Sequence, residues 1–520
     1  MRRRSLVAWA LPALLALACG EAASGENVTQ PAAGPAPAAP STGAPVGPAA
    51  PTAPPPEKEV ESDYEAPVAT ADFVWIANPK SGRVAYVDAR TLQVRTTEAG
   101  NGPTYLASVP GQAVDSALVL NVLSNDATLF RVTSAGIESK TFPVAARANT
   151  MAFSSDGRFA IAWADSRKVP GAPRTEGFQD LTVLDLVAGT STILAVGYRP
   201  VAVGFAAGVP RAYAVTQDGV AILSLAGAPI VTKNVAISDT PNEDPGSRDV
   251  SVTPDGTIAL IRRDDSAVVT AVNLDTGART SVTLPGPVTD LDLAPKGDRA
   301  IAVVRATSQA VVLPIPGIVS APGTFTSVTA AGESIGSVSL APSGSKGLLY
   351  TNASAVERVT VLDLAAEPPS LRTVRLYSPA LAVFGAPDAG HAVVLHDGVS
   401  GAPGAFSLVP VANALPAKIV ATRARPTAVA VTNDRAVIAE RDDAAKVHGA
   451  YLARMPQLMV ERYPLASPPI AVGVVPSAKR AFIAQRHPDG RLTFVDLESG
   501  RARTLTGFEL AARVVDGSTP

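Results

Sequence analysis

Two short runs of charged residues hold the side chains best suited to bind a ligand. They read Arg262-Arg263-Asp264-Asp265 and Glu440-Arg441-Asp442-Asp443, and each follows the strand expected to open a repeat unit. Carboxylates beside a guanidinium group can hold a cation or a polar ligand. The candidate ligand-facing residues are Arg263, Asp264, Asp265, Arg441, Asp442 and Asp443. The alternative, which the mixed charges favour, is a solvated loop that neutralises itself.

No pattern in the chain marks a catalytic or metal centre. The sequence has one cysteine and four histidines, and it lacks the calcium-loop, His-Glu-x-x-His, Gly-x-Ser-x-Gly and phosphate-loop motifs. The nearest acidic cluster, Asp239 to Asp244, has the wrong spacing for a calcium loop and contains proline. We therefore predict no metal, no cofactor and no catalytic residue, and we favour a binding protein over an enzyme.

Composition excludes several classes of partner. The chain has 520 residues, of which 47% are hydrophobic, with 44 basic against 46 acidic side chains and a formal charge of −2. Nucleic-acid binding requires Lys and Arg clustered on one face, so no nucleic-acid partner is expected. A single cysteine also excludes a disulfide framework.

A second set of carboxylates recurs at one place in successive repeats. Each lies at the end of a short apolar strand, just before a turn. Aspartate in such a position accepts hydrogen bonds from backbone amides of the turn, so we interpret these residues as turn caps. The set is Asp88, Asp185, Asp275, Asp363 and Asp496. Asp156-Gly157 and Asp255-Gly256 are interpreted as hairpin turns in which glycine takes a positive φ.

Residues 1–18 have the layout of a secretory signal peptide. Three arginines at positions 2–4 precede an uncharged stretch of 14 residues, which is shorter than the ~20 residues that span a bilayer. The run Leu15-Ala16-Leu17-Ala18-Cys19 resembles the bacterial lipobox, where a signal peptidase cuts before the cysteine and the thiol carries diacylglycerol. The resemblance implies that Cys19 is the lipid attachment site. The alternative is an ordinary signal peptide followed by a chance cysteine.

Residues 19–65 are expected to form the lipidated N-terminus and a disordered linker. Ten prolines lie between Pro31 and Pro56 among Ala, Gly, Ser and Thr, and such a segment cannot bury enough apolar surface to offset the entropy of ordering. After cleavage the chain would carry 41 basic and 46 acidic residues. Two or three acyl chains anchor a protein stably. The resemblance to bacterial lipoproteins, with Gly20 rather than Asp after Cys19, implies a protein lipid-anchored in the bacterial envelope, at the periplasmic or surface face of the outer membrane.

Residues 66–520 read as a series of short strands. Runs of Val, Ile, Leu, Ala and Phe are broken every 8–12 residues by Gly, Pro, Asp and Asn. A turn of Pro-Asp-Gly type recurs between apolar runs, at intervals of 41–51 residues. Its marker glycines are Gly111, Gly157, Gly208, Gly256, Gly297, Gly344 and Gly390. A period of 40–50 residues with four short strands per unit is typical of a β-propeller blade.

The first unit resembles the YVTN family of β-propeller repeats. The resemblance rests on Trp75-Ile-Ala-Asn78-Pro-Lys-Ser-Gly82-Arg-Val84-Ala-Tyr-Val-Asp88, and a related pattern ends at Phe494-Val-Asp496-Leu-Glu-Ser-Gly500. WD40-type propellers are a more distant relative. The resemblance implies an all-β propeller domain of four-stranded blades over residues 66–520.

Counting the units gives ten. Their openings lie near Phe73, Ala117, Phe159, Arg211, Ile258, Ala300, Gly347, Ala392, Val437 and Ala481. No linker comparable to the N-terminal one interrupts the array, so we predict a single ring of eight to ten blades. Two smaller rings, or terminal units with another role, are the alternatives.

Three functions are consistent with these observations. The favoured one is a lipid-anchored binding or scaffold protein whose propeller face docks an envelope protein, a peptide or a glycan. The others are a propeller hydrolase or lactonase-like enzyme, with acidic residues around the central channel, and a structural subunit of an outer-membrane assembly, which rests on fold analogy. The insert from Lys168 to Asp180 is either a candidate binding loop or a decorative insertion.

Overall fold

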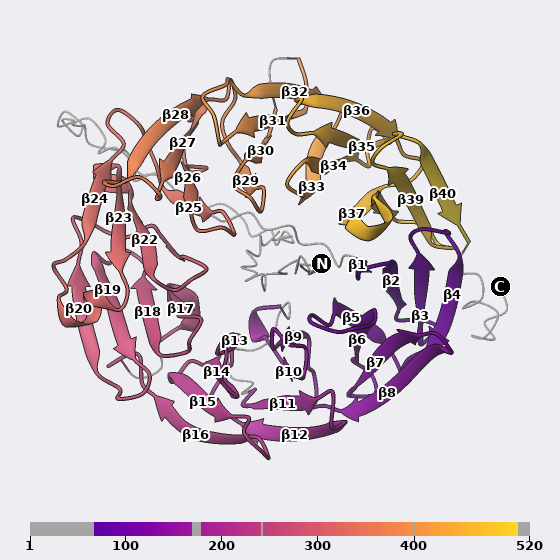
Figure 1. Cartoon of the computed structure of the whole chain (residues 1–520), viewed down its shortest axis with the longest axis horizontal. Coiled ribbons are helices and arrows are strands. Elements are labelled where there is room, and N and C mark those ends of the chain that lie inside the picture. The colour runs from indigo at the N-terminus through magenta and orange to yellow at the C-terminus, as the bar shows by residue number, and fades with distance from the viewer. Residues whose placement is uncertain (1–66, 169–177, 241–242, 399–400, 508–520) are drawn as a thin grey trace, which may run out of the picture.

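The strands form ten antiparallel sheets around one axis (Figure 1). The computed structural model describes residues 67–168, 178–240, 243–398 and 401–507. Each sheet, or blade, consists of four strands that are consecutive in sequence, with the first strand nearest the axis and the fourth at the rim. The predicted all-β propeller is confirmed, as a single ring of ten blades.

The blades, numbered 1 to 10 in chain order, are built from strands of two to eight residues. Blades 1 to 3 contain β1 (Val68–Ala69), β2 (Phe73–Asn78), β3 (Arg83–Asp88), β4 (Val94–Glu98), β5 (Pro103–Ser108), β6 (Ser116–Asn121), β7 (Asp126–Thr133), β8 (Gly136–Pro143), β9 (Thr150–Phe153), β10 (Phe159–Trp163), β11 (Asp180–Asp185) and β12 (Thr190–Ala195). Blades 4 to 6 contain β13 (Ala202–Phe205), β14 (Arg211–Val215), β15 (Val220–Ser224), β16 (Ile230–Val235), β17 (Arg248–Val252), β18 (Ile258–Arg263), β19 (Val268–Asn273), β20 (Arg279–Thr283), β21 (Asp290–Leu293), β22 (Arg299–Val304), β23 (Gln309–Pro314) and β24 (Thr326–Thr329).

The remaining four blades continue the same order. They contain β25 (Ser337–Leu340), β26 (Lys346–Tyr350), β27 (Arg358–Asp363), β28 (Ser370–Arg375), β29 (Ala382–Gly385), β30 (His391–His396), β31 (Gly404–Pro410), β32 (Lys418–Thr422), β33 (Arg425–Val431), β34 (Arg435–Asp442), β35 (Val447–Arg454), β36 (Met459–Pro464), β37 (Pro469–Val475), β38 (Arg480–Gln485), β39 (Arg491–Asp496) and β40 (Ala502–Thr506). All ten predicted unit openings fall in the second strand of a blade. The repeat units predicted from the sequence are therefore displaced by one strand from the blades of the structure.

Helices are short and lie in the loops. They are α1 (Gly317–Ser320) and the 3-10 turns η1 (Ser166–Lys168), η2 (Pro245–Ser247), η3 (Arg305–Thr307) and η4 (Pro476–Ala478). Within the described ranges, no helix combines the length and the apolar character needed to cross a membrane.

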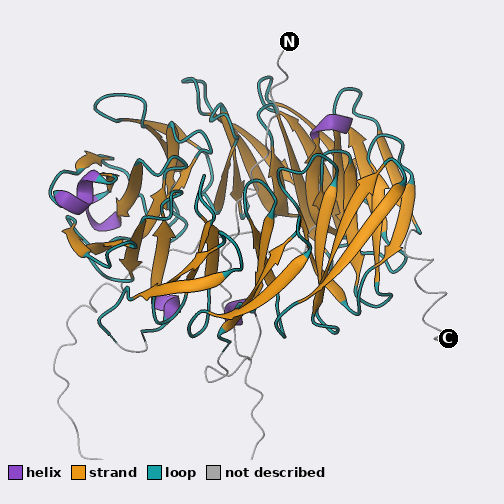
Figure 2. Cartoon of the chain, turned by 60° about the horizontal axis from the view of Figure 1, so that its bottom comes forward, coloured by secondary structure: helices purple, strands orange, loops and turns teal. Residues whose placement is uncertain are grey.

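The loops collect on two opposite faces of the ring (Figure 2). One face, here called the upper face, carries the turns between second and third strands and the connections from one blade to the next. The lower face carries the turns between first and second strands and between third and fourth strands. Antiparallel order in every blade imposes this division, so the loops after Arg263 and Asp442 belong to the upper face.

The apolar core is divided into ten layers, one at each junction between neighbouring blades. Between blades 1 and 2, the rings of Trp75 and Phe130 stack with centroids 6.2 Å apart. Between blades 8 and 9, Phe406 and Tyr451 meet edge to face at 5.3 Å. Most layers consist of Val, Ala, Ile and Leu, and the β-branched side chains of Val and Ile suit a pleated, half-buried surface. Each sheet therefore buries both of its faces against other sheets.

Among the residues that the structure describes, the ring closes without a strand shared between its first and last blades. Blade 1 consists of β1 to β4 and blade 10 of β37 to β40, so the described part of the C-terminal region adds no strand to the first sheet. Closure depends on an apolar layer like the other nine. Its fully buried members include Val74 and Val87 of blade 1 with Phe482 and Phe494 of blade 10.

Polar contacts reinforce this seam. The hydroxyl of Ser477 donates to the carboxylate of Asp72 at 2.7 Å. The guanidinium of Arg480 donates to the carbonyl oxygen of Ala89 at 2.8 Å. The second contact links strand β38 to the turn after β3, so it spans the two ends of the chain.

The Arg480 contact belongs to a repeated pattern on the lower face. At seven junctions in the described ranges, a basic side chain of one blade donates to a carbonyl oxygen in the turn between the third and fourth strands of the next. The pairs are Arg131–Leu186, Lys233–Asp275, Arg299–Leu364, Arg372–Val411, Lys418–Leu458, Arg454–Glu498 and Arg480–Ala89. The seam is therefore built like the internal junctions.

Four of the five predicted turn caps are confirmed. The carboxylates of Asp88, Asp185, Asp363 and Asp496 each accept hydrogen bonds from backbone amides of the turn that follows. The prediction of a turn cap at the fifth residue, Asp275, was wrong. Strand β19 ends two residues earlier, so the side chain of Asn273 makes the cap, accepting from the amides of Asp275 and Thr276. Asp275 instead pairs with Arg211 at 2.8 Å.

Both predicted hairpin turns are confirmed, whereas one of the marker glycines is displaced from the structural repeat. Gly157 and Gly256 have φ of +66° and +70°, as positive-φ turns require. The marker Gly390 does not occupy the corresponding position, because Ala389 takes the left-handed conformation there, with φ of +59°. The Gly spacing in blade 8 is therefore displaced by one residue from the structural repeat.

Loss of the ring seam should destabilise the whole domain. Phe494 is 1% exposed in the closing layer and Phe406 is fully buried at the junction of blades 8 and 9. We expect Phe494→Ala and Phe406→Ala each to lose about 3–5 kcal/mol, because each leaves a cavity in a packed layer. Urea unfolding followed by circular dichroism measures both. A neutral Phe494→Ala beside a destabilised Phe406→Ala would mean that the seam is open in solution.

Candidate functional site

The two predicted charged loops lie on the upper face but do not meet. Arg263 ends β18 in blade 5, whereas Asp442 ends β34 in blade 9, and these strands lie on different sides of the ring (Figure 1). They form two separate charged groups, each built together with residues from neighbouring elements.

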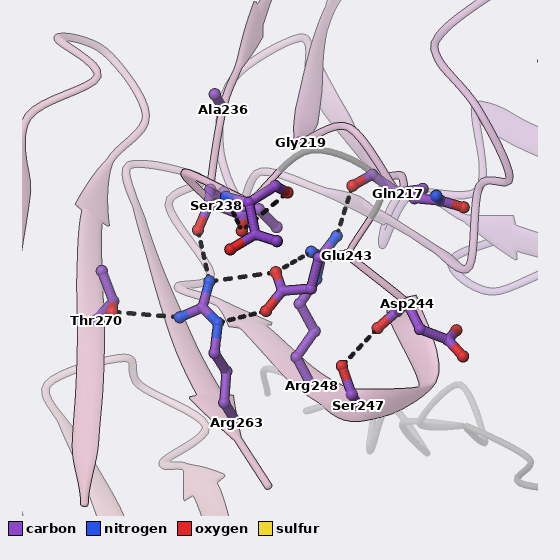
Figure 3. A network of polar contacts seen from close by, with 12 residues as sticks. Gln217, Gly219, Ala236, Ser238, Glu243, Asp244, Ser247, Arg248, Arg263 and Thr270 are labelled. Carbon is purple, nitrogen blue, oxygen red and sulfur yellow. Dashed lines mark hydrogen bonds and ion pairs between the residues drawn. The ribbon is translucent and has the colours of Figure 1, made fainter. Parts of the chain in front are cut away.

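In blade 5, Arg263 and Arg248 hold the carboxylate of Glu243 between them (Figure 3). The Nε of Arg263 lies 2.6 Å from Glu243 Oε1, and Arg248 Nη1 contacts Oε2. Glu243 comes from the connection between blades 4 and 5, while Arg248 begins the innermost strand β17. Arg248 has only 1% of its side chain exposed and Glu243 has 13%, so this ion pair is largely withdrawn from water.

Both arginines are also held by groups other than Glu243. Arg248 donates to the carbonyl oxygens of Thr216 and Gln217 at 3.0 and 2.9 Å. Arg263 donates to the carbonyl oxygen of Ile237 at 3.0 Å. Thr216 and Gln217 lie in the turn between the second and third strands of blade 4, and Ile237 follows its last strand, so the network fastens blade 5 to blade 4 at the upper face.

This environment changes the acidity of Glu243. Burial on its own would raise the pKa, but hydrogen bonds from Arg263, Arg248 and Ser238 outweigh it and lower the pKa from 4.5 to about 2. The carboxylate therefore stays ionised throughout the physiological range. The three charges act as a structural fastening at neutral pH.

The rest of the blade 5 run pairs within the loop. Arg262 contacts the carboxylates of Asp249 and Asp264, the second at 3.0 Å. Asp264 remains 57% exposed and Asp249 60% exposed. Asp265 is exposed and takes a left-handed backbone, with φ of +56°. Asp249 and Asp264 are thus held in place by Arg262 while much of each carboxylate stays in solvent.

The blade 9 run has a related arrangement. Arg441 binds the carboxylate of Asp443 through two nitrogens, with the Nε contact at 2.8 Å. The imidazole of His448 lies 3.3 Å from the same carboxylate. The hydrogen bond from Arg441, supported by His448, lowers the pKa of Asp443 to about 2. Asp442 accepts a hydrogen bond from the amide of Ala445 and shapes the turn.

Glu440, which begins this run in the sequence, is a structural residue. It is fully buried, and its Oε2 accepts hydrogen bonds from the amides of Arg423 and Ala424 and from the hydroxyl of Tyr451. Its Oε1 accepts from Arg462 Nε at 2.6 Å. Four donors and one guanidinium charge compensate the buried carboxylate.

The residues that sequence reasoning missed are Glu243 and Arg248. The acidic cluster from Asp239 to Asp244 was considered only as a calcium loop, and its spacing excluded that. Its use as an arginine partner depends on β18 lying beside the preceding connection, which no local pattern records. Within the described ranges, no three His, Cys, Asp or Glu side chains gather as metal ligands. Cys19 and residues 169–177 of the predicted binding loop lie outside the described residues.

The comparisons with known proteins concern the fold. No protein-family model matches the chain, and no curated protein matches it. Among solved structures, a chain of hydrazine synthase from Kuenenia stuttgartiensis is 18% identical, covering 59% of this chain and 97% of its own, with a TM-score of 0.34. A eukaryotic initiation factor is 11% identical over 84% of this chain and 97% of its own, with a TM-score of 0.49. Dihydro-heme d1 dehydrogenase is 12% identical over 88% and 78%, with a TM-score of 0.39. The chain is a ten-bladed β-propeller, and these similarities say nothing about its activity.

The Glu243 network should make stability depend on pH. Because the folded pKa of about 2 lies below the ordinary 4.5, the stabilisation is complete above about pH 4.5 and is lost as pH falls toward 2. The shift corresponds to roughly 3 kcal/mol at neutral pH. We expect Glu243→Gln to unfold at lower urea concentration than the wild type at pH 7, and the difference to shrink toward pH 3.

The matched control is Asp239→Asn. Asp239 pairs with Arg279 but is 94% exposed, so its loss should change stability by less than about 1 kcal/mol. A difference between Glu243→Gln and wild type that stays constant from pH 7 to pH 3 would contradict the assignment of an ionised, stabilising Glu243.

The Glu440 network also requires glycine at position 449, because a side chain there would overlap with it. A Cβ at Gly449 would lie 2.5 Å from Glu440 Oε1 and 2.8 Å from Arg462 Nη2. We expect Gly449→Ala to lose about 1–3 kcal/mol of stability through overpacking, measured by urea unfolding. Gly323→Ala is the control, since nothing lies within 4 Å of its Cβ position. Equal stability of the two variants would show that the network relaxes freely around residue 449.

Proposed function

We propose that this protein is a non-enzymatic binding or scaffold protein of the bacterial cell envelope. In this proposal the lipid on Cys19 holds it to the outer membrane, and the upper face of the propeller docks an envelope protein, a peptide or a glycan. The proline-rich linker of residues 19–65 separates the anchor from the propeller.

The observation that supports a binding role is the way the upper face presents its charges. Asp264 and Asp443 are 57% and 50% exposed, yet each is held by an arginine of its own loop. Arg262 and Arg441 are themselves only 13% and 14% exposed. A partner therefore meets carboxylates whose positions are already set, so little side-chain entropy is lost on binding.

The ring gives these groups a rigid support. Blade 5 is fastened to blade 4 by Glu243, and the second strand of blade 9 holds the buried Glu440 just before Arg441. Binding residues are often carried on loops that a rigid scaffold holds in position. The proposal needs no catalytic residue, which agrees with the sequence-based preference for a binding protein.

The test is affinity purification of the tagged, full-length protein from its own detergent-solubilised envelope, with mass spectrometry and glycan analysis of what co-purifies. We expect a stoichiometric partner, at least tenfold depleted by the double variant Asp264→Asn with Asp443→Asn. Asp275→Asn, a lower-face carboxylate that is 53% exposed, is the control and should retain the partner.

The anchor is tested separately with Cys19→Ala. We expect this variant to leave the membrane fraction. If it fractionates with membranes like the wild type, the lipid anchor is wrong. If the double variant keeps the partner in full, the two charged loops are not the docking surface. The proposed binding role of these loops is then wrong, and the protein should be screened for enzymatic activity.

A further inference from the structure

We propose that the lower face of the ring carries a docking pocket, at Gly385 between blades 7 and 8, for one leucine or phenylalanine side chain of a partner protein. In most other blades the equivalent space is filled by a side chain of the chain itself. The inference goes beyond the proposed function, because this pocket lies on the face opposite to the two charged loops.

A plug residue at the lower end of the innermost strand recurs around the ring. In seven blades, a bulky apolar residue there pairs with an alanine or glycine of the second strand. It is partly buried and packs against the apolar layer shared with the preceding blade. The plug residues are Phe153, Phe205, Val252, Leu293, Leu340, Val431 and Val474. They cover the inner edge of these layers at the lower face.

Blade 8 lacks a plug residue. Gly385 occupies the position and pairs with Ala392 of the second strand. Among the described residues, no partly buried hydrophobic side chain packs against the layer between blades 7 and 8, whereas the other nine layers each have at least one. The space that a plug residue fills elsewhere is therefore open here.

Neither the backbone nor close packing requires glycine at position 385. Its φ lies outside the left-handed region, so a residue with a side chain fits the backbone. A Cβ at this position would have no atom within 4 Å. The inner-strand glycine of blade 4 differs, because a Cβ at Gly204 would lie 2.2 Å from the hydroxyl of Tyr213.

A pocket lies at this position, beside the axis where β25 and β29 are neighbours (Figure 1). Its apolar wall includes Ala341 and Leu348 of blade 7 and Ala389 and Val411 of blade 8. The empty space measures about 210 Å³, part of it open to solvent. Sites for small-molecule ligands usually measure about 300–1,000 Å³, so this pocket suits a single side chain.

One polar atom of the pocket wall is unsatisfied. His391 lines the pocket, and its Nδ1 is buried without a hydrogen-bond partner among the described residues. Burial lowers the pKa of His391 against the opposing effect of Asp388, so the imidazole is neutral at pH 7. A buried nitrogen left without a partner costs free energy. The backbone of a polypeptide can supply a donor or an acceptor, which a hydrocarbon molecule cannot.

The walls of the pocket are held by neighbouring elements. Arg372 of blade 7 donates to the carbonyl oxygens of Pro410 and Val411 at 3.2 and 3.0 Å. The amide of Asp388, in the turn that follows Gly385, donates to Asn433 of blade 9 at 3.1 Å. Binding to a pocket that is already formed requires little ordering of loops.

The chain itself indicates the occupant. Phe, Leu and Val fill the equivalent position in the seven other blades, so these layers accept hydrocarbon side chains of that size. A single aromatic or aliphatic side chain in a pocket is a common anchor of protein interfaces. Leu and Phe extend further from the backbone than Val, which suits a partner that approaches from outside the ring.

The first test fills the pocket from within. Gly385→Leu places at position 385 the residue type found at Leu293 and Leu340, and cavity filling commonly stabilises a protein. We expect the thermal unfolding midpoint to equal or exceed that of the wild type. Gly323→Leu is the matched control, because nothing lies within 4 Å of its Cβ position and it lies outside the pocket. It should gain no stability.

The second test measures binding by saturation-transfer NMR on the full-length lipidated protein in lipid nanodiscs, with empty nanodiscs as the blank. The probes are the blocked tripeptides acetyl-Gly-Leu-Gly-amide, acetyl-Gly-Phe-Gly-amide and acetyl-Gly-Ala-Gly-amide. We expect saturation of the Leu or Phe side chain, with the Ala peptide roughly tenfold weaker. The signal should be lost in Gly385→Leu. It should persist in Gly323→Leu and in the double variant Asp264→Asn with Asp443→Asn.

Several results would overturn the inference. They are no binding of the Leu or Phe peptide at millimolar concentration, equal binding of the Ala peptide, and unchanged binding in Gly385→Leu. A clearly lower unfolding temperature for Gly385→Leu would show that the pocket has no room for a side chain. If Gly385→Leu instead converts an oligomer to a monomer in sedimentation, the occupant is a second copy of this chain and the assignment to a partner protein fails.

Discussion

Packing between neighbouring blades is the interaction on which the whole structure depends. A single blade has two apolar faces and no core of its own, so each sheet is stable only between two others. The first and last blades meet the same requirement through the layer that holds Phe482 and Phe494. Within the described ranges no strand is exchanged between blades 1 and 10, which are joined by this apolar layer together with the Ser477–Asp72 and Arg480–Ala89 hydrogen bonds. This explains why small and branched apolar residues dominate the sequence while bulky aromatics are few.

The two faces of the ring use charge differently. On the lower face, basic side chains such as Arg299 and Arg480 reach across to carbonyl oxygens of the next blade, and short acidic or amide side chains cap the turns. The hydrogen-bonding groups of these lower-face side chains are engaged in contacts within and between blades. On the upper face, Glu243 also fastens two blades, but Asp264 and Asp443 are held with their outer oxygens in water. A surface whose charges are fixed and still exposed is suited to recognition.

Sequence reasoning reached the fold through periodicity and failed where a contact joins distant segments. The repeated turns predicted ten units because each blade uses the same local chemistry, and the caps at Asp88 and Asp496 follow from strand ends that the pattern marks. Asp275 was misassigned because the aspartate at the expected motif position lies two residues beyond the strand end, where Asn273 already makes the cap. The placement of Glu243 between two arginines could not be predicted, since it depends on how one blade lies against the next.

The amino-acid sequence by itself determined the class of the fold, the number of repeats, the turn chemistry and the positions of the two charged loops. These are local properties, set by the alternation of apolar residues and by the backbone preferences of Gly, Pro, Asp and Asn. Only the tertiary structure decided that the ring closes with all ten blades and that the charged loops stand apart. It also decided that Glu440 is buried while Asp443 is not. These outcomes depend on contacts between segments far apart in the chain, whose geometry is set when the blades pack together.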